Sequence, residues 1–152
     1  MPSVLFVCTA NVCRSPMAMA IFRNLVQGDQ EDWEVASAGT WAIEGVPVTS
    51  KALFVLQSKG LDISDHRSQT VSRELIDRFD LILTMEKNQK EALSAEFPQR
   101  ARRIFLLSEM IGLVYDVPDP IGKPLIDFQN TSNEIEQTLK LGLPKIRRLA
   151  KR

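Results

Sequence analysis

Short apolar runs alternate along the chain with segments in which apolar residues recur at helical spacing. Residues 4–7 form the clearest run, and a continuous apolar run is typical of a strand covered on both faces of a parallel sheet. Further strands are expected at residues 33–38, 80–84 and 103–107. The alternation of strand and helix favours one α/β domain, residues 1–152, with helices on both faces of a parallel sheet.

Local signals set the expected helix boundaries. Ser15 resembles a helix cap, and Pro16 follows it at a first-turn position, so the first helix is expected to begin there. A closing helix is expected from residue 131 onward, kinked or interrupted at Gly142 and Pro144. Three more helices are expected, at residues 49–59, 73–79 and 87–97.

Charge and hydropathy exclude several classes of function. Nineteen Lys and Arg residues balance nineteen Asp and Glu residues, so the chain lacks the positive field that nucleic-acid or membrane-surface binding usually needs. Its apolar runs are far shorter than the ~20 residues that span a bilayer, and its start does not resemble a secretory leader. We therefore expect a cytoplasmic protein, a monomer or weak dimer.

The candidate chemistry lies between the first strand and the first helix, in the segment from Cys8 to Ser15. A loop that runs into a helix amino terminus directs backbone N–H groups at one place, and the helix dipole adds positive potential, so the loop attracts a tetrahedral oxyanion. The same field favours the thiolate of Cys8, a nucleophile. Arg14 is suited to hold two phosphate oxygens, and Ser15 to hydrogen-bond the sulfur of Cys8.

This segment resembles the Cys-x5-Arg-Ser motif of low-molecular-weight protein tyrosine phosphatases, which also lies close to the amino terminus. The Ser-Ala-Gly run at Ser37, the His-Arg pair at His66 and the Asp-Pro pair at Asp119 are similar to further family motifs. The resemblance spans residues 3 to about 150. It implies a four-stranded parallel sheet in the order 2-1-3-4, a phosphate-binding loop after strand one, and hydrolysis of phosphotyrosine through a cysteinyl phosphate without a cofactor or metal.

The resemblance also implies roles for individual residues. Asp119 corresponds to the general acid, and Asp116 is its nearest competitor. Members commonly have aromatic residues after the Asp-Pro pair, whereas this chain has Ile121 as the substrate-wall residue there. Trp41 is the candidate aromatic wall on the opposite side of a phosphotyrosine ring. The phosphate-binding and supporting residues implied are Thr9, Ala10, Asn11, Val12, Cys13, Ser15, Ser37 and His66, and a hydrogen-bond network is implied among Asn11, Ser15, Ser37 and His66.

Other functions are weighed against this one. In arginine phosphatases of the family a threonine typically follows the loop asparagine, and Val12 here favours phosphotyrosine. Arsenate reduction on this scaffold needs further thiols downstream, and the chain has no cysteine after Cys13. The chain lacks the Gly-x4-Gly-Lys run of P-loop nucleotide hydrolases. A module that only binds phosphate would have no use for both a nucleophilic cysteine and an acid. Cys13 is either a packing residue or a resolving thiol for Cys8.

Overall fold

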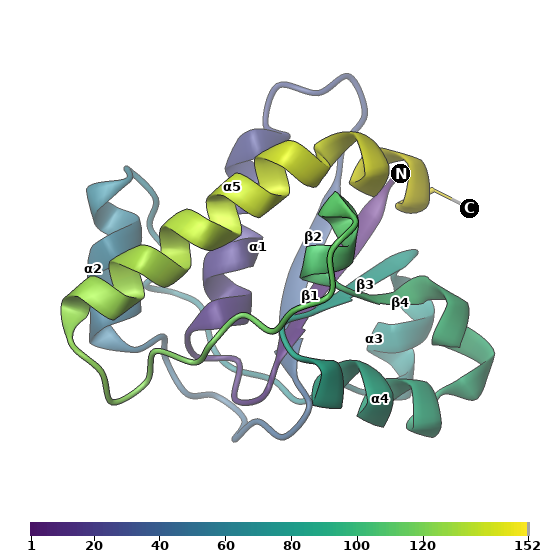
Figure 1. Ribbon diagram of the computed structural model, residues 1–152, viewed down its shortest axis with the longest axis horizontal. Helices are drawn as coiled ribbons and strands as arrows, with labels where there is room; N and C mark the ends of the chain where they lie inside the picture. The colour runs from purple at the N-terminus through teal and green to yellow at the C-terminus, as the bar shows by residue number, and fades with distance from the viewer. Residues whose placement is uncertain (152) are drawn as a thin grey trace.

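The computed structural model describes residues 1–151 and contains a four-stranded, all-parallel sheet in the order β2-β1-β3-β4 (Figure 1). Val4 in the central strand β1 lies opposite Val35 of β2 and Leu81 of β3. The predicted strands and their order are confirmed. Their bounds are β1 Ser3–Cys8, β2 Glu34–Gly39, β3 Leu81–Thr84 and β4 Ile104–Leu106.

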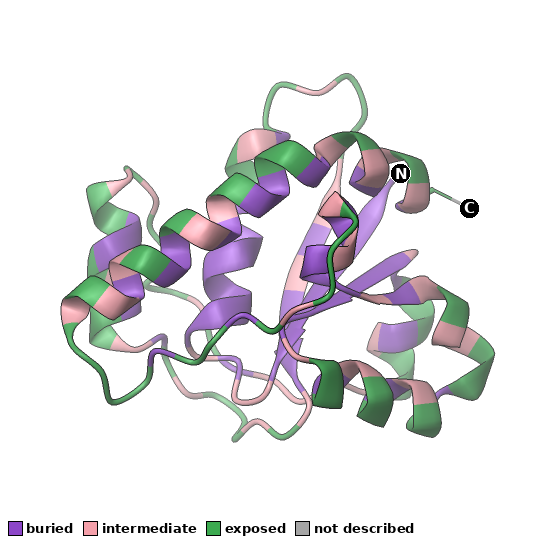
Figure 2. Cartoon of the chain, in the orientation of Figure 1, coloured by how far each residue is buried: buried purple, intermediate pink, exposed green. Residues whose placement is uncertain are grey.

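Helices cover both faces of the sheet, as expected. Val4 and Phe6 of β1 point into the core under α1, α2 and α5, while Leu5 and Val7 point into a second core under α3 and α4. Burial is therefore continuous along β1, as Figure 2 shows. The helices are α1 Arg14–Leu25, α2 Ser50–Ser58, α3 Arg73–Arg78, α4 Lys87–Glu96 and α5 Leu125–Leu149, and two short 3-10 helices are η1 Pro98–Arg103 and η2 Leu107–Ile111.

The start of α1 differs from the prediction that Ser15 caps it. Cys13 is the capping residue, the helix begins at Arg14, and Ser15 and Pro16 lie in its first turn. The proline is tolerated there because first-turn N–H groups have no partner within the helix. Since Ser15 is inside the helix, its hydroxyl is available to the sulfur of Cys8 rather than to a helix end.

The closing helix was expected to be kinked or interrupted at Gly142 and Pro144, and the structure contradicts the interruption. α5 begins at Leu125 and continues through Gly142 and Pro144 to Leu149. An interior proline costs about 3 kcal/mol, and the burial of a long apolar face against α1, α2 and η2 outweighs that local cost. Gly142 has a packing reason, because a Cβ at this position would lie 2.8 Å from the Cβ of Met110 in η2.

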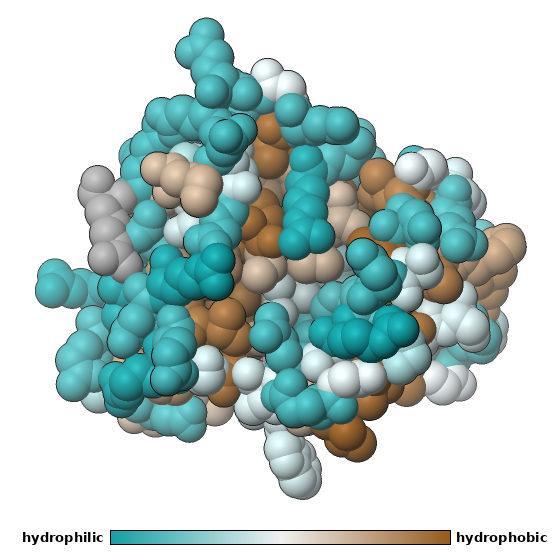
Figure 3. Space-filling model, turned by 180° about the vertical axis from the view of Figure 1, so that it is seen from behind, coloured by the Kyte–Doolittle hydropathy of each residue, from teal (hydrophilic) through white to brown (hydrophobic). Residues whose placement is uncertain are grey.

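The surface agrees with the balanced composition. On the face opposite to the view of Figure 1, hydrophilic side chains surround smaller apolar areas (Figure 3). Of the helices in residues 1–151, none combines the length and the apolar character needed to cross a membrane.

Candidate active site

The segment after β1 lies at the carboxyl end of the sheet, where Cys8 ends the central strand and Arg14 begins α1. This is where open parallel sheets usually bind ligands. In the loop between them Asn11 and Cys13 are buried, while Thr9, Ala10 and Val12 are partly exposed. A Cβ at Gly39 would lie only 2.3 Å from the carbonyl oxygen of Thr9, so glycine is required where the end of β2 meets the loop.

The sulfur of Cys8 lies 3.0 Å from Oγ of Ser15 and is almost completely buried. Asn11 Nδ2 donates to Ser15 Oγ at 2.8 Å, so the hydroxyl keeps its own hydrogen for another acceptor. That hydrogen can point to the sulfur at 3.0 Å or to the more distant carbonyl oxygen of Ala38 at 3.4 Å. The arrangement is suited to stabilising a thiolate on Cys8.

Asn11 organises the loop from a left-handed backbone conformation, φ +60°. Its side-chain Nδ2 donates to Ser37 Oγ at 2.9 Å as well as to Ser15, and its Oδ1 accepts from the backbone N–H of Gln69 at 3.0 Å. The latter bond fixes the orientation of the amide, because a backbone N–H only donates. His66 Nε2 lies 3.1 Å from the carbonyl oxygen of Asn11. The structure thus brings the four expected network residues together and adds Gln69.

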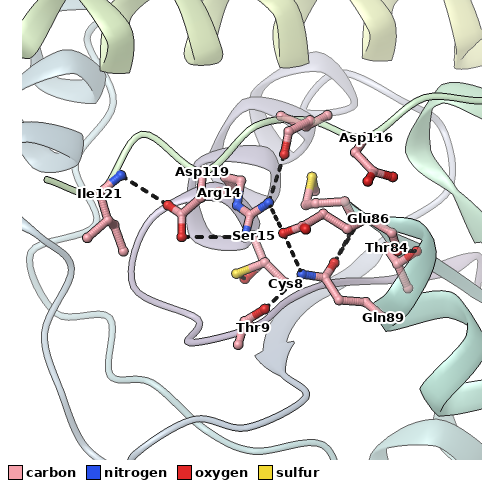
Figure 4. Close-up of polar contacts among 12 residues, drawn as sticks. Cys8, Thr9, Arg14, Ser15, Thr84, Glu86, Gln89, Asp116, Asp119 and Ile121 are labelled. Atoms are coloured by element: carbon pink, nitrogen blue, oxygen red, sulfur yellow. Dashed lines mark hydrogen bonds and ion pairs between the residues drawn. The ribbon is translucent and has the colours of Figure 1, made fainter. Parts of the chain in front are cut away.

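The guanidinium of Arg14 lies at the centre of the polar contacts drawn in Figure 4. Its Nη1 donates to Glu86 Oε2 at 2.5 Å and to the carbonyl oxygen of Val117 at 2.7 Å. Its Nη2 lies 3.7 Å from Oδ2 of Asp119. Because the side chain is only 3% exposed, these contacts fix the orientation of its planar fork.

Glu86 and Gln89 are site residues that the sequence reasoning missed. Glu86 follows β3 and begins α4 in a capping box with Gln89. Gln89 Nε2 also donates to Thr9 Oγ1 at 3.0 Å, so this one helix start holds both Arg14 and the phosphate loop. The available signal was partial: Gln89 fits the last position of a capping box, but Glu86 stands where that pattern has Ser or Thr.

Two acidic residues were candidates for the general acid, and the structure separates them. Asp119 faces Arg14, and its Oδ1 accepts from the backbone N–H of Ile121 at 3.0 Å. Asp116 instead accepts from the backbone N–H of Lys87 at 2.8 Å and makes none of the contacts drawn to Arg14 (Figure 4). The geometry favours Asp119, whose side chain is 45% exposed and therefore accessible to a leaving group.

The two proposed substrate walls lie at the rim. Trp41 is 86% exposed, and its backbone N–H donates to the carbonyl oxygen of Thr9, which places it next to the loop. Ile121 is 46% exposed and follows Asp119. Large apolar side chains that remain exposed beside a polar site are suited to contact a ligand.

Cys13 is buried and carries a free thiol, as does Cys8. Burial raises the pKa of the Cys13 thiol far above its ordinary value, and the nearby charges of Cys8 and Asp119 raise it further, while Arg14 opposes them. Cys13 therefore remains protonated beside a nucleophile of the same chemical type. Within residues 1–151, no group of three or more His, Cys, Asp and Glu side chains is arranged to hold a metal ion.

Comparisons with known proteins agree with this geometry. The family model described as low molecular weight phosphotyrosine protein phosphatase matches residues 3–151. A probable low molecular weight protein-tyrosine-phosphatase, EpsP of Ralstonia nicotianae, is 37% identical over 147 residues, which cover 97% of each chain.

Solved structures of the same type are similar throughout. The crystal structure of a low molecular weight protein tyrosine phosphatase from T. tengcongensis has a TM-score of 0.91 at 41% identity and covers 95% of this chain and 99% of its own. The arginine phosphatase YwlE of Geobacillus stearothermophilus has a TM-score of 0.90 at 34% identity, with 97% and 94% covered. The similar structures thus include both a tyrosine phosphatase and an arginine phosphatase.

Proposed function

The chain belongs to the low-molecular-weight phosphotyrosine protein phosphatase family, and we propose that Cys8, Arg14 and Asp119 perform its reaction, the hydrolysis of phosphotyrosine through a cysteinyl phosphate. The observation that supports these assignments is the convergence of the three side chains at the carboxyl end of β1. Such a reaction needs a nucleophile, a cation for the phosphate oxygens and a proton donor. The structure offers the Cys8 sulfur, hydrogen-bonded to a hydroxyl, the oriented guanidinium of Arg14 and the accessible carboxyl of Asp119.

The contacts of Arg14 indicate which of its atoms bind phosphate. Nη1 carries two hydrogens, and the contacts with Glu86 and Val117 use both. The N–H groups of Nε and Nη2 are left to form a fork for two phosphate oxygens. Loop N–H groups at the amino terminus of α1 supply further donors for the equatorial oxygens.

In the first step the thiolate of Cys8 attacks phosphorus in line with the ester oxygen. The S–P bond forms as the P–O bond to the tyrosyl group breaks, and protonated Asp119 gives its proton to the departing oxygen. Ser15 donates its hydroxyl hydrogen to the sulfur before attack and again when the sulfur leaves.

In the second step water attacks the phosphorus of the cysteinyl phosphate. Asp119, now a carboxylate, takes a proton from that water, the S–P bond breaks, and the thiolate of Cys8 and inorganic phosphate are released. Each group thus returns to its starting protonation state, and no further reactant is consumed.

Phosphorylated protein is the substrate class of this family, and the residue after the loop asparagine supports tyrosine as the phosphorylated residue. Val12 is partly exposed within the loop, so its aliphatic side chain borders the site. Arginine phosphatases are among the relatives, which makes phosphoarginine the second candidate. Trp41 at the rim favours a planar aromatic leaving group, whereas Ile121 makes its side of the rim less aromatic.

Comparative turnover tests this proposal directly. Three peptides of one sequence that contain phosphotyrosine, phosphoserine or phosphoarginine are incubated with the enzyme, and released phosphate is measured. We expect the phosphotyrosine peptide to have the highest kcat/KM. A higher kcat/KM for the phosphoarginine peptide would assign the enzyme to the second candidate.

The proposal includes a cytoplasmic location and a monomer or weak dimer that binds neither nucleic acid nor membranes. Two free thiols, one of them the nucleophile, suit a reducing compartment. The balanced charge supports the absence of a polyanion partner. Fractionation of cells tests the location, and sedimentation of the purified protein tests the oligomeric state.

A further inference from the structure

A small polar cavity lies behind the phosphate loop, between α1, the middle of β2 and the segment 63–69. Its volume is about 230 Å³, below the roughly 300–1,000 Å³ of sites for drug-sized ligands, so it suits a small ion. Arg23 of α1 and Ser37 of β2 contribute to its wall, together with His66, Arg67 and Gln69. None of these residues takes part directly in the chemistry at Cys8.

The charged groups on the wall are mainly positive. Arg23 and Arg67 contribute two guanidinium groups, and Asp65 contributes one carboxylate. Arg23 Nη2 donates to the carbonyl oxygen of Val35 at 2.7 Å, which fixes one guanidinium at the wall. Arg67 Nη1 donates to the carbonyl oxygens of Ser64 and His66 at 3.1 and 2.7 Å. A guanidinium has five N–H donors, so both arginines keep donors for an anion.

The third basic group on the wall is His66, and burial is the main cause that lowers its pKa. Burial lowers the pKa of His66 below its ordinary value of 6.5, the bond to Asn11 raises it, and Arg23 and Arg67 lower it while Asp65 raises it. Its Nε2 must carry a hydrogen, since a carbonyl oxygen accepts it. The proton that His66 gains on acidification therefore goes to Nδ1.

Three residues of the cavity wall are the ones that hold Asn11. Ser37 Oγ accepts from its Nδ2, the N–H of Gln69 donates to its Oδ1, and His66 bonds its carbonyl oxygen. Gln69 Nε2 also donates to the carbonyl oxygen of Ser37 at 3.0 Å. Asn11 in turn bonds Ser15, which contacts the sulfur of Cys8, so the cavity adjoins the hydrogen-bond chain that ends at the nucleophile.

We infer that this cavity binds a small oxyanion of phosphate or sulfate size between Arg23 and Arg67, beside the imidazole of His66. A negative charge between the two guanidinium groups offsets their repulsion of an imidazolium, so the bound anion should raise the pKa of His66 and favour a proton at Nδ1. The site is separate from the phosphate loop, and the hydrogen bonds of Asn11 and Ser15 lie between it and Cys8.

The test uses the fact that His66 is the single histidine of the chain. Its ring resonances report its pKa by NMR in the intact protein, with sodium sulfate as the probe and sodium chloride at matched ionic strength as the control. Sulfate should raise the pKa of His66 by about one unit, the low end of the effect of an opposite charge within ~4–6 Å. This readout needs no turnover, so its failure is distinct from a failure of the proposed function.

Variants separate the cavity from the catalytic loop. Arg67→Gln should abolish the sulfate-dependent rise, while Arg148→Gln, which removes an exposed arginine from α5, should retain it. Inhibition by sulfate of aryl phosphate hydrolysis should be equal in Arg67→Gln and the unmodified enzyme, since that inhibition reports the catalytic loop. No rise in the unmodified protein, a full rise in Arg67→Gln, or loss of the rise in both variants would overturn the inference.

Discussion

Oε2 of Glu86 lies 2.5 Å from Nη1 of Arg14, in an ion pair whose arginine side chain is only 3% exposed. The two residues are 72 positions apart in sequence and meet because β3 lies beside β1 in the sheet. Glu86 occupies one edge of the guanidinium and leaves the opposite edge for phosphate. A carboxylate near an anion-binding site opposes phosphate binding, so its benefit must lie in orienting Arg14.

Glu86→Gln should therefore lower turnover without weakening phosphate binding. Loss of the charged partner lets the guanidinium move, and a displacement of ~1 Å can cost about 10²-fold, so we expect kcat to fall about 10–100-fold. The inhibition constant for inorganic phosphate should stay equal or decrease, because a negative charge has been removed. Steady-state kinetics measure both, and Glu91→Gln on the exposed side of α4 is the matched control. An unchanged kcat would show that Glu86 is not needed to orient Arg14.

Asp119→Asn should slow hydrolysis in a way that depends on the leaving group. For phosphotyrosine, whose leaving group needs a proton, the rate should fall about 10²–10⁴-fold, the range of general acid catalysis. The loss should shrink for an activated aryl phosphate that departs without protonation. Asp116→Asn is the matched control, since that carboxylate bonds Lys87 instead. If only the Asp116 variant showed this dependence, the assignment would be reversed.

Cys13 should protect Cys8 from irreversible oxidation. Peroxide converts the thiolate of Cys8 to a sulfenic acid, and the thiol of Cys13 then displaces water from it to form a disulfide. Because the raised pKa of Cys13 keeps it protonated, this second step should be slow and should accelerate with rising pH. Mass spectrometry and recovery of activity with dithiothreitol measure it. Equal recovery of a Cys13→Ser variant would show that Cys13 protects nothing.

The rim should control aryl phosphate binding more than catalysis. Trp41→Ala should raise KM, and Ile121→Tyr should lower it, each by up to about tenfold, because an aromatic contact contributes about 0.5–1.5 kcal/mol beyond its buried area. kcat should change little, since both side chains border the ring and not the phosphorus. Initial rates over a range of aryl phosphate concentrations provide both constants. If KM stayed constant in both variants, the ring would bind elsewhere.

The fold was predictable from the sequence where one interaction dominates. β1 is covered on both faces, so its residues form a continuous apolar run that is visible without a structure. The continuous course of α5 was not predictable, because the local helix propensities of Gly142 and Pro144 favour an interruption. The contact of Gly142 with Met110 and the burial of the apolar face lie outside any local window.

The candidate site was predictable from the sequence only where its residues lie in one short loop. Cys8, Arg14 and Ser15 share one short loop, so their spacing alone indicated their chemistry. The partners of that loop come from distant segments: Glu86 and Gln89 from the start of α4, and Gln69 from the segment before α3. Only the order of the strands determines which of these segments meet the loop.

The central claim is that Cys8 forms a covalent bond to phosphorus, and the most direct test is hydrolysis of a chromogenic aryl phosphate by Cys8→Ser. This account predicts no measurable turnover by that variant, with phosphate still bound, because Arg14 and the loop remain. Cys13→Ser, five residues away, should retain activity since its thiol takes no part in either step. Appreciable hydrolysis by Cys8→Ser, in a preparation free of the unmodified enzyme, would contradict the account.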